Sequence, residues 1–404
     1  MDSKIAFDLV VKDNEQVTNL VEFYKSSPSF EINYNTPLNI SFDQEIPNYE
    51  TVRDHWNEQV SKFRSRKKYK KSNIREKNAS TDELTIYRLP GALVFSEKLF
   101  ISNFAGEIPR ATLLGIKSFR SETYFEHKSY DDLVEVLHQK KRLKTNCVNF
   151  RFSPERVILL SSAIQRNYYH WMVECLPKMA LFKPLLNEDP GLKVLINANL
   201  PRFAFDSLAL MGLPKERIVT VKNVTAYPEL TFASRISFSN QSISPLVNDF
   251  YQDLTKSLFA RDVSTCDLPK RIYISRKNSS MRQVINEDEL MVSLRKLGFE
   301  IIDNERFSLF EQAQIFHNAE FIIGAHGAGL ANLVFCQPKT KVIELIHDEF
   351  KQGITSYASL AELFSLEYYL YVSQADADLS PKSGASCHFY ADLNMIDSLV
   401  KKLL

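Results

Sequence analysis

The sequence lacks the patterns that mark secreted and membrane-spanning chains. No apolar run approaches the roughly 18 residues that a membrane-spanning helix needs. The first residues show no basic stretch followed by an apolar core, so we expect no signal peptide. The five cysteines are scattered and form no C-x-x-C pair, which is typical of reduced thiols. The sequence therefore predicts a cytoplasmic protein that contacts a membrane only at its inner surface.

A large net charge is also missing. The chain has 50 Lys and Arg residues against 49 Asp and Glu residues, which argues against nucleic-acid binding through bulk charge. The exception is the basic run SKFRSRKKYKKSNIREK at residues 61–77. Two interpretations stay open for this run. It is either a solvated connector or a surface that contacts anionic lipid or an acidic acceptor polymer.

Several catalytic motifs are absent, and a different glycine pattern is present. The sequence has no G-x-S-x-G nucleophile elbow, no dinucleotide-binding G-x-G-x-x-G and no P-loop. Instead, EFIIGAHGAGLAN at residues 320–332 places three glycines after a short apolar run that predicts a buried strand. Glycines at a strand-to-helix turn let the backbone approach a ligand, and the new helix favours an anion such as a phosphate. A tight turn made only for packing is the alternative.

The order of apolar runs predicts an α/β fold. From about residue 156, short strands alternate with helices, which indicates largely parallel sheets. We expect an N-terminal extension at 1–80, an acceptor-side domain at 81–244 and a nucleotide-binding domain at 245–404. Two helix starts have capping-box spacing, Asn286 with Glu289 and Ser308 with Glu311.

Cations and an acid lie near the glycine turn in the predicted fold. The segment ISRKNSSMR, residues 274–282, follows a predicted strand and carries Arg276, Lys277 and Arg282. Because the carboxyl ends of parallel strands meet at one edge, we expect this loop beside the glycine turn, where arginine forks suit a diphosphate. Glu344, expected to end the next strand, is a candidate acceptor for ribose hydroxyls. An ion-paired or exposed surface acid is the alternative.

Two further groups are candidates for chemistry. In NYYHWMVECLPKM, residues 167–179, His170 and Glu174 are four residues apart and share a helix face. A histidine held by a carboxylate can act as a general base near neutral pH, although a purely structural pair is the alternative. Asp376 and Asp378 form an Asp-x-Asp that could hold a metal ion. We nevertheless expect no essential metal or other cofactor, because the basic loop supplies positive charge.

The histidine–tryptophan helix, the S-R-K loop, the E-Q helix and the H-G-A-G-L turn, in this order, resemble glycosyltransferase family 61 over about residues 150–370. That family includes bacterial capsular-polysaccharide enzymes, plant xylan-decorating transferases and animal O-linked N-acetylglucosamine transferases. The resemblance implies a GT-B-like fold of two facing Rossmann-like domains and an inverting mechanism. It implies that the C-terminal half binds a nucleotide sugar, which we expect to be a UDP-sugar. The expected donor-binding residues are Arg276, Lys277, Arg282, Gly324, His326, Gly327, Ala328, Gly329, Asn332 and Glu344.

The resemblance also implies a biological setting. The acceptor would be a glycan or lipid-linked glycan held mainly by the N-terminal half, with His170 or Glu174 as the catalytic base. Animal and plant members carry lumenal targeting that this chain does not show, so we expect the bacterial, cytoplasmic type that builds capsular or other cell-surface polysaccharide. Two alternatives remain: an NAD-linked enzyme of the same fold, and a non-catalytic nucleotide- or sugar-binding subunit of a polysaccharide-assembly complex.

Overall fold

The computed structural model describes most of the chain from residue 148 onward and a set of strands before it. The described residues form two compact units, one ending at Phe238 and the other beginning at Ser242. The basic run 61–77 lies outside the described residues. The described ranges are 3–5, 8–12, 21–26, 84–95, 100–103, 107–109, 134–137, 142–145, 148–160, 165–221, 224–234, 236–238, 242–260, 268–350, 356–376, 378–380 and 386–404.

The first unit is built on a mixed sheet. Its centre is parallel, because β10 (Arg156–Leu159) pairs in parallel with β11 (Lys193–Asn197) and with β13 (Thr225–Ala233). Next to β11 lies β12 (Ile218–Val221), again parallel, whereas β4 (Leu84–Phe95) runs antiparallel to β13. The sheet is completed by β1 (Ser3–Ile5), β3 (Val21–Ser26), β5 (Phe100–Asn103) and β9 (Val148–Phe152). A smaller sheet holds β6 (Glu107–Pro109), β2 (Asp8–Lys12), β8 (Arg142–Thr145) and β7 (Val134–Leu137).

The helix expected from Asn167 is not uniform. Asn167 caps it by accepting a hydrogen bond from the Tyr169 amide at 2.9 Å. The segment then passes through α3 (Tyr168–His170), a π-helix (Trp171–Cys175), a 3-10 turn (Leu176–Lys178) and α4 (Met179–Glu188). Pro177 has no amide hydrogen, so regular α-helical bonding cannot continue through it. Such π-helical turns often occur at functional sites. The other long helix of this unit is α5 (Arg202–Leu210).

The second unit contains a five-stranded, fully parallel sheet in the order β17-β16-β18-β19-β20, which confirms the predicted α/β class. The strand that comes first in sequence therefore lies second in the sheet. The strands are β16 (Arg271–Ile274), β17 (Glu300–Ile302), β18 (Phe321–Ala325), β19 (Lys341–His347) and β20 (Glu367–Ser373). The short strands β21 (Ala375–Asp376) and β22 (His388–Phe389) form a separate antiparallel pair.

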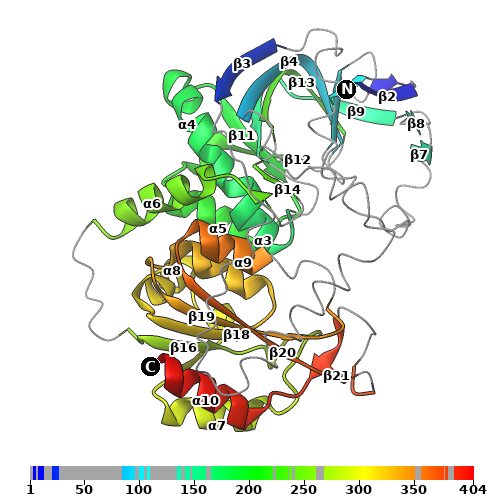
Figure 1. Ribbon diagram of the computed structural model, residues 1–404. Helices are drawn as coiled ribbons and strands as arrows, with labels where there is room; N and C mark the ends of the chain where they lie inside the picture. Colours follow the sequence, from blue (N-terminus) through cyan, green and yellow to red (C-terminus); the bar gives the residue numbers. More distant parts are fainter. Residues whose placement is uncertain are drawn as a thin grey trace. The chain divides into compact units, whose positions relative to one another are not determined.

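Helices cover both faces of this sheet (Figure 1). On one side α7 packs against the C-terminal helix α10, and on the other lie α8, α9 and the 3-10 helix η8. Their bounds are α6 (Leu246–Leu258), α7 (Glu287–Lys296), α8 (Leu309–Asn318), η8 (Ala328–Phe335), α9 (Ser356–Leu363) and α10 (Leu393–Leu403). None of the described helices combines the length and apolar character needed to cross a membrane.

One of the two expected capping boxes is present. The Ser308 hydroxyl accepts from the Glu311 amide, and the Glu311 carboxylate accepts from the Ser308 amide, so this prediction is confirmed. The prediction of a capping box at Asn286 was wrong, because the Asn286 side chain makes no capping hydrogen bond. It donates to the carbonyl of Ala391 and accepts from that residue's amide, and it thereby ties the start of α7 to the segment that leads into α10.

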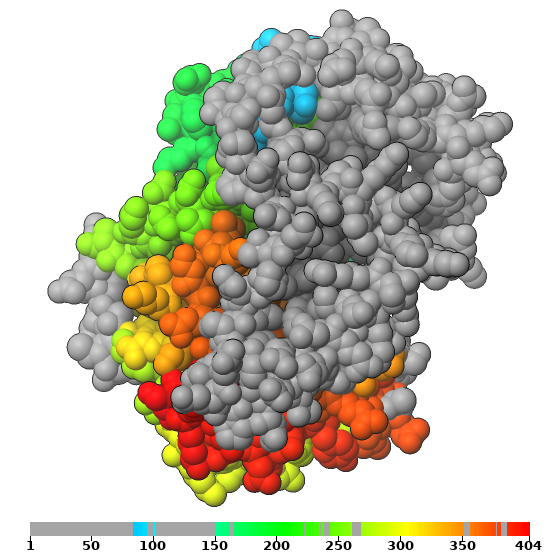
Figure 2. All heavy atoms as spheres, in the orientation of Figure 1, coloured from blue at the N-terminus to red at the C-terminus, as the bar shows by residue number. Residues whose placement is uncertain are grey.

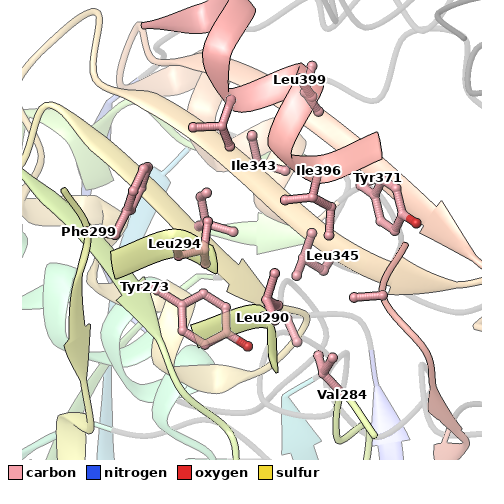
Figure 3. Packing of buried hydrophobic residues seen from close by; sticks show 14 of the residues in the cluster. Tyr273, Val284, Leu290, Leu294, Phe299, Ile343, Leu345, Tyr371, Ile396 and Leu399 are labelled. Carbon is pink, nitrogen blue, oxygen red and sulfur yellow. The ribbon is translucent and has the colours of Figure 1, made fainter. Parts of the chain in front are cut away.

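The core between α7, α10 and the sheet is apolar. Leu290 and Leu294 of α7 meet Ile396 and Leu399 of α10 above Ile343 of β19 (Figure 3). The outer side of α10 lies at the surface shown in Figure 2, where its residues are red. This packing fixes the sheet as a rigid platform and leaves its carboxyl edge to the connecting loops.

His347 is an exception within this core. It ends β19 and is 1% exposed, with its ring centroid 5.9 Å from that of Phe389 and 6.1 Å from that of Phe350. Both ring nitrogens are buried without a hydrogen-bond partner. The pKa of His347 is lowered to about 4, chiefly by burial; Asp348 and Glu349 oppose this effect, whereas Arg282 and His326 add to it. The histidine is therefore folded into the protein in its neutral form.

His347 should make the folded state sensitive to acid. The folded protein resists protonation that the unfolded chain accepts near pH 6.5, so the stability is intact above that pH and declines as the pH falls towards 4. We expect the wild type to lose roughly 2 kcal/mol more unfolding free energy across this interval than His347→Leu. Denaturant unfolding of both proteins at several pH values measures the difference. Parallel pH curves for the two proteins would contradict this assignment.

Candidate functional site

The candidate site lies where the order of the parallel sheet reverses. After β16 the chain forms β17 on one side of β16, and it then crosses back to form β18 on the other side. The loops that follow β16 and β18 therefore lead in opposite directions. Ligands of doubly wound sheets bind in the crevice at this point, beyond the carboxyl ends of the strands. Ile274, the last residue of β16, pairs with Gly324 of β18. The loop with Arg276 and Arg282 and the turn with Gly327 therefore leave adjacent strands, as expected.

The glycines of the turn serve different purposes. Gly324 lies within β18 and not in the turn, and a Cβ there would be 3.3 Å from side-chain atoms of Ile274 and Leu330. Gly327 and Gly329 flank Ala328, the first residue of η8. The helix expected after the turn is thus present, but it is a 3-10 helix. A Cβ on Gly329 would be 2.8 Å from the Asn304 amide nitrogen, so this glycine allows close packing against the loop after β17.

Arg276 lies directly across the turn. A Cβ on Gly327 would be only 1.6 Å from Nη1 of Arg276, so the guanidinium occupies the space that any larger residue would need. Its Nη2 donates to the Ser279 hydroxyl at 2.6 Å and to the Met281 carbonyl at 2.9 Å. Its Nε is buried without a hydrogen-bond partner. No carboxylate pairs with this guanidinium among the residues that the structure describes.

A buried acid positions the backbone of Arg276. Glu287, in the first turn of α7, is 4% exposed and accepts hydrogen bonds from the Tyr273 hydroxyl at 2.8 Å and from the Arg276 amide at 2.9 Å. The carboxylate thus holds the chain where it leaves β16, while the Arg276 side chain remains directed at the glycine turn. The guanidinium position is set by packing and hydrogen bonds before any ligand arrives.

Arg282 is the second cation at the turn. Its backbone has a φ of 54°, a left-handed conformation that costs a residue with a side chain roughly 1–2 kcal/mol. Its Nε donates to the His326 carbonyl at 3.1 Å, and its guanidinium carbon lies 5.5 Å from the centre of the Phe350 ring. Strained residues of this kind persist where the surrounding structure holds them, and they cluster at functional sites.

The two guanidiniums repel each other in a partly buried setting. The pKa of Arg276 is lowered to about 10, first by burial and then by the neighbouring charge of Arg282. Burial also lowers the pKa of Arg282. Both groups remain protonated at neutral pH, and an anion between them would relieve their repulsion and their loss of water. The pair is therefore suited to a diphosphate.

Tyr357 of α9 holds the glycine turn in place. Its hydroxyl donates to the Gly327 carbonyl at 2.6 Å, and the residue is 3% exposed. Burial raises the pKa of this hydroxyl, so it stays a neutral donor. The peptide between Gly327 and Ala328 is consequently fixed between α9 and Arg276.

His326 belongs to a buried chain of polar groups. Its Nδ1 contacts one oxygen of Glu344, whose other oxygen accepts a hydrogen bond from the Tyr368 hydroxyl of β20. Glu344 is fully buried, whereas 11% of the His326 side chain is exposed. The His326 ring also packs against Phe350, with ring centroids 4.2 Å apart, and against Tyr357 at 5.1 Å. This polar chain thus joins Tyr368 of β20 and Glu344 in the middle of β19 to the residue that follows β18.

The structure corrects the expected placement of three donor-binding residues. Glu344 does not end its strand, which continues to His347, and both its oxygens contact protein groups instead of facing a ribose. Lys277 points outward and pairs with Asp288 of α7 at 2.6 Å, and this hydrogen bond raises its pKa. Asn332 is fully buried and donates to the Gln312 side chain at 2.8 Å, which makes it a packing residue.

His170 and Glu174 lie close together in the first unit. His170 Nδ1 and Glu174 Oε1 are 2.9 Å apart, although their angle is not that of a hydrogen bond. Both side chains are largely buried. Trp171 anchors this π-helical turn by donating from its indole nitrogen to the Ser207 hydroxyl at 2.8 Å. The pair is thus held rigidly after β10, and its catalytic role stays a prediction.

Asp376 has a structural role in its loop. Its carboxylate accepts from the amides of Asp378 at 3.1 Å and Leu379 at 2.9 Å, which is how an aspartate stabilises its own turn. Asp378 is exposed. Within the described part of the chain, no group of three His, Cys, Asp or Glu residues is placed to hold a metal ion.

Sequence reasoning did not identify the residues that support the site. Tyr273, Glu287, Tyr357 and Tyr368 come from four separate elements and form no motif with the glycine turn. The single available signal was the acid in the first turn of α7, which sequence analysis alone cannot distinguish from an ordinary helix-start residue. Their roles arise from contacts across the fold.

In a comparison with known proteins, one family model matches residues of both units. The family model described as Glycosyltransferase 61 matches residues 168–343, a range that includes His170, Arg276 and the glycine turn. The chain is also 33% identical over 125 residues to an EGF domain-specific O-linked N-acetylglucosamine transferase of Drosophila melanogaster. It is 32% identical over 103 residues to the protein of the same name in Mus musculus.

These alignments are partial. They cover 29% of this chain and 23% of the Drosophila protein, and 24% of this chain and 19% of the mouse protein. The chain thus spans about a fifth of the length of the curated relatives it matches. The family match and the names of the relatives agree on the type of enzyme. They support a glycosyltransferase, and the Glycosyltransferase 61 model matches this chain at residues 168–343.

Proposed function

We propose that this protein is an inverting glycosyltransferase that uses a nucleotide-sugar donor, whose diphosphate binds between Arg276, Arg282 and the Gly327 turn. The observation that carries the proposal is the Arg276 guanidinium, which lies across Gly327 at the switch point of a parallel sheet with no carboxylate partner among the described residues. Charge develops on the diphosphate as it leaves, and a fixed cation at that point lowers the barrier to transfer.

The donor we propose is a UDP-sugar, with UDP-N-acetylglucosamine the first to test. Both relatives are named as N-acetylglucosamine transferases, and they are 33% and 32% identical to this chain over the aligned residues. Their named acceptor is not carried over, because most of their length has no counterpart in the alignment. A glycan or lipid-linked glycan used in cell-surface polysaccharide synthesis is our proposed acceptor.

In an inverting transfer the acceptor oxygen attacks the anomeric carbon from the side opposite the diphosphate. The bond to the diphosphate oxygen breaks with its electron pair, and a base takes the acceptor proton. We propose a GT-B arrangement in which the first unit supplies that base, from the His170–Glu174 pair. Its support is the short His170–Glu174 distance of 2.9 Å within a π-helical turn.

We propose that no divalent metal is essential. Arg276 and Arg282 supply the positive charge that a metal would otherwise provide, and Asp376 is engaged in its own turn. We also propose a reducing, cytoplasmic location. Its support is that Cys336 is a buried free thiol.

Arg276→Ala tests the proposed function directly. We expect it to weaken UDP binding by roughly 1.5–3 kcal/mol, the usual contribution of a hydrogen bond to a charged group. Lys270→Ala is the matched control, because it removes the same charge before β16 at the opposite end of the strand, where Lys270 pairs with exposed Glu320. Isothermal titration with UDP, GDP and dTDP measures the affinities. Unchanged affinity in a folded Arg276→Ala protein would overturn the assignment.

Gly327→Ala should act through Arg276. The added methyl group would overlap Nη1, and the flexible guanidinium would yield before the backbone, which is extended at φ 175° and accepts alanine. We expect a folded protein whose UDP affinity falls by roughly the same 1.5–3 kcal/mol. Gly191→Ala, in an exposed turn of the first unit, is the control.

A double-mutant cycle separates this mechanism from general damage to the turn. If Gly327 matters because it makes room for Arg276, the Arg276→Ala and Gly327→Ala double variant should bind UDP no more weakly than Arg276→Ala alone. Additive losses would show that the methyl group disturbs something other than the guanidinium.

His170→Asn tests the proposed base. General-base assistance contributes roughly 10²–10⁴-fold to a rate, so kcat should fall by that order. UDP affinity should stay near that of the wild type, because the donor site is in the other unit. A near-normal kcat in the folded variant would remove His170 from the mechanism, and joint loss of stability and UDP binding would make the pair structural.

A further inference from the structure

The polar chain from Tyr368 through Glu344 to His326 has the form of a proton-holding device. Glu344 is fully buried in the middle of β19, and an isolated buried carboxylate is unfavourable unless it is hydrogen-bonded or paired. Its two oxygens contact His326 Nδ1 and the Tyr368 hydroxyl. Burial and the charge of Glu344 both raise the pKa of Tyr368, which therefore remains a neutral donor. The negative charge beside the imidazole is thus well supported.

The imidazole is restrained on every side except one. The His326 amide donates to the Leu345 carbonyl at 2.8 Å, and the His326 carbonyl accepts from Arg282. The ring packs against Phe350 and Tyr357, and its Nδ1 faces Glu344. Nε2 is then the one ring nitrogen available to a ligand, on a side chain of which 11% is exposed.

This nitrogen belongs to the residue that precedes Gly327, across which Arg276 lies. The Phe350 ring links the two groups, because the Arg282 guanidinium carbon lies 5.5 Å from its centre and the His326 ring centroid lies 4.2 Å from it, so a ligand held by Arg282 lies near the His326 ring. Because the ring is held in place before binding, it needs no rearrangement to meet a ligand oxygen.

We propose that His326 takes up a proton when a nucleoside diphosphate binds and donates a hydrogen bond from Nε2 to a diphosphate oxygen. Glu344 and Tyr368 are its positioning residues. The inference rests on the proposed function, since it assigns a role within the same diphosphate site.

The charges that face the His326 ring explain why proton uptake accompanies ligand binding. Glu344 of β19 contacts Nδ1 of the ring, and Arg282, in the loop after β16, donates to the carbonyl of the same residue. His347 is neutral, and Tyr357 of α9 is a neutral neighbour. A diphosphate adds negative charge on the Nε2 side and offsets the arginine charge. The imidazolium then lies between two anionic groups, which is the arrangement that stabilises it most.

The proton is held through the transfer step. The bond between the anomeric carbon and the diphosphate oxygen breaks, and its electron pair stays on that oxygen. The acceptor oxygen forms the new bond and releases its proton to the base of the first unit. His326 supplies a charged hydrogen bond to the departing diphosphate, which is stronger than a neutral one, and it keeps its proton until the product leaves.

Proton uptake on UDP binding provides the test. Isothermal titration of UDP in buffers of different ionisation enthalpy, at about pH 7.5, measures the protons taken up per bound nucleotide. We expect the wild type to take up as much as about one proton more than His326→Asn. Its affinity advantage over the variant should shrink by up to tenfold per pH unit as the pH rises. His317→Asn, at the amino end of the sheet, is the control and should behave as the wild type.

Two further variants distinguish positioning from support of the fold. Glu344→Gln removes the buried charge but can still hydrogen-bond to His326 and Tyr368, so it should lose the extra proton uptake. Tyr368→Phe breaks the same polar chain and keeps the charge, so it should retain the uptake. Loss of UDP affinity in both variants, with proton uptake unchanged in each, would make the network structural and overturn these roles.

The outcomes separate this inference from the function on which it rests. Equal proton uptake by the wild type and a folded His326→Asn protein would overturn the inference and leave the donor site standing. A wild-type protein that binds none of UDP, GDP and dTDP would overturn the proposed function and this inference with it.

Discussion

The contact between Arg276 and Gly327 is the constraint on which the site depends. A guanidinium can lie across the turn because residue 327 has no side chain, and any larger residue there would have to displace it. Glu287 holds the Arg276 amide from one side, and Tyr357 holds the Gly327 carbonyl from the other. A cation is therefore fixed over the backbone of the glycine turn at a point where topology already opens a crevice. Its position is determined by the fold and not by a ligand.

This arrangement carries a cost that the rest of the unit offsets. Two arginines with lowered pKa values lie near each other, and Arg282 adopts a left-handed backbone. The apolar packing of α7 and α10 against the sheet stabilises the platform that holds them (Figure 3). In the donor site that we propose, an anion between the two guanidiniums would replace their repulsion by attraction, which is how a preorganised binding site differs from a packing turn.

The sequence was informative about the main chain of the site. Glycine spacing after an apolar strand, and arginines after another, predicted two loops at one edge of a parallel sheet, and the strand register places them side by side. Side-chain direction was not predictable. Arg276 and Lys277 are adjacent and chemically alike, yet one turns inward to Gly327 and the other outward to Asp288 of α7. That difference depends on a helix whose placement only the folded sheet determines.

Glu344, which we expected at the end of its strand, shows the same limit of prediction from sequence. An acid within an apolar run reads as the end of a strand, because a carboxylate is rarely buried in the middle of a sheet. Here burial is tolerated because His326, 18 residues earlier, and Tyr368, 24 residues later, meet its two oxygens from neighbouring strands. No local pattern records this compensation. The buried acid is nevertheless informative about the candidate site. The hydrogen-bonded network that satisfies the Glu344 carboxylate also orients His326, beside the glycine turn.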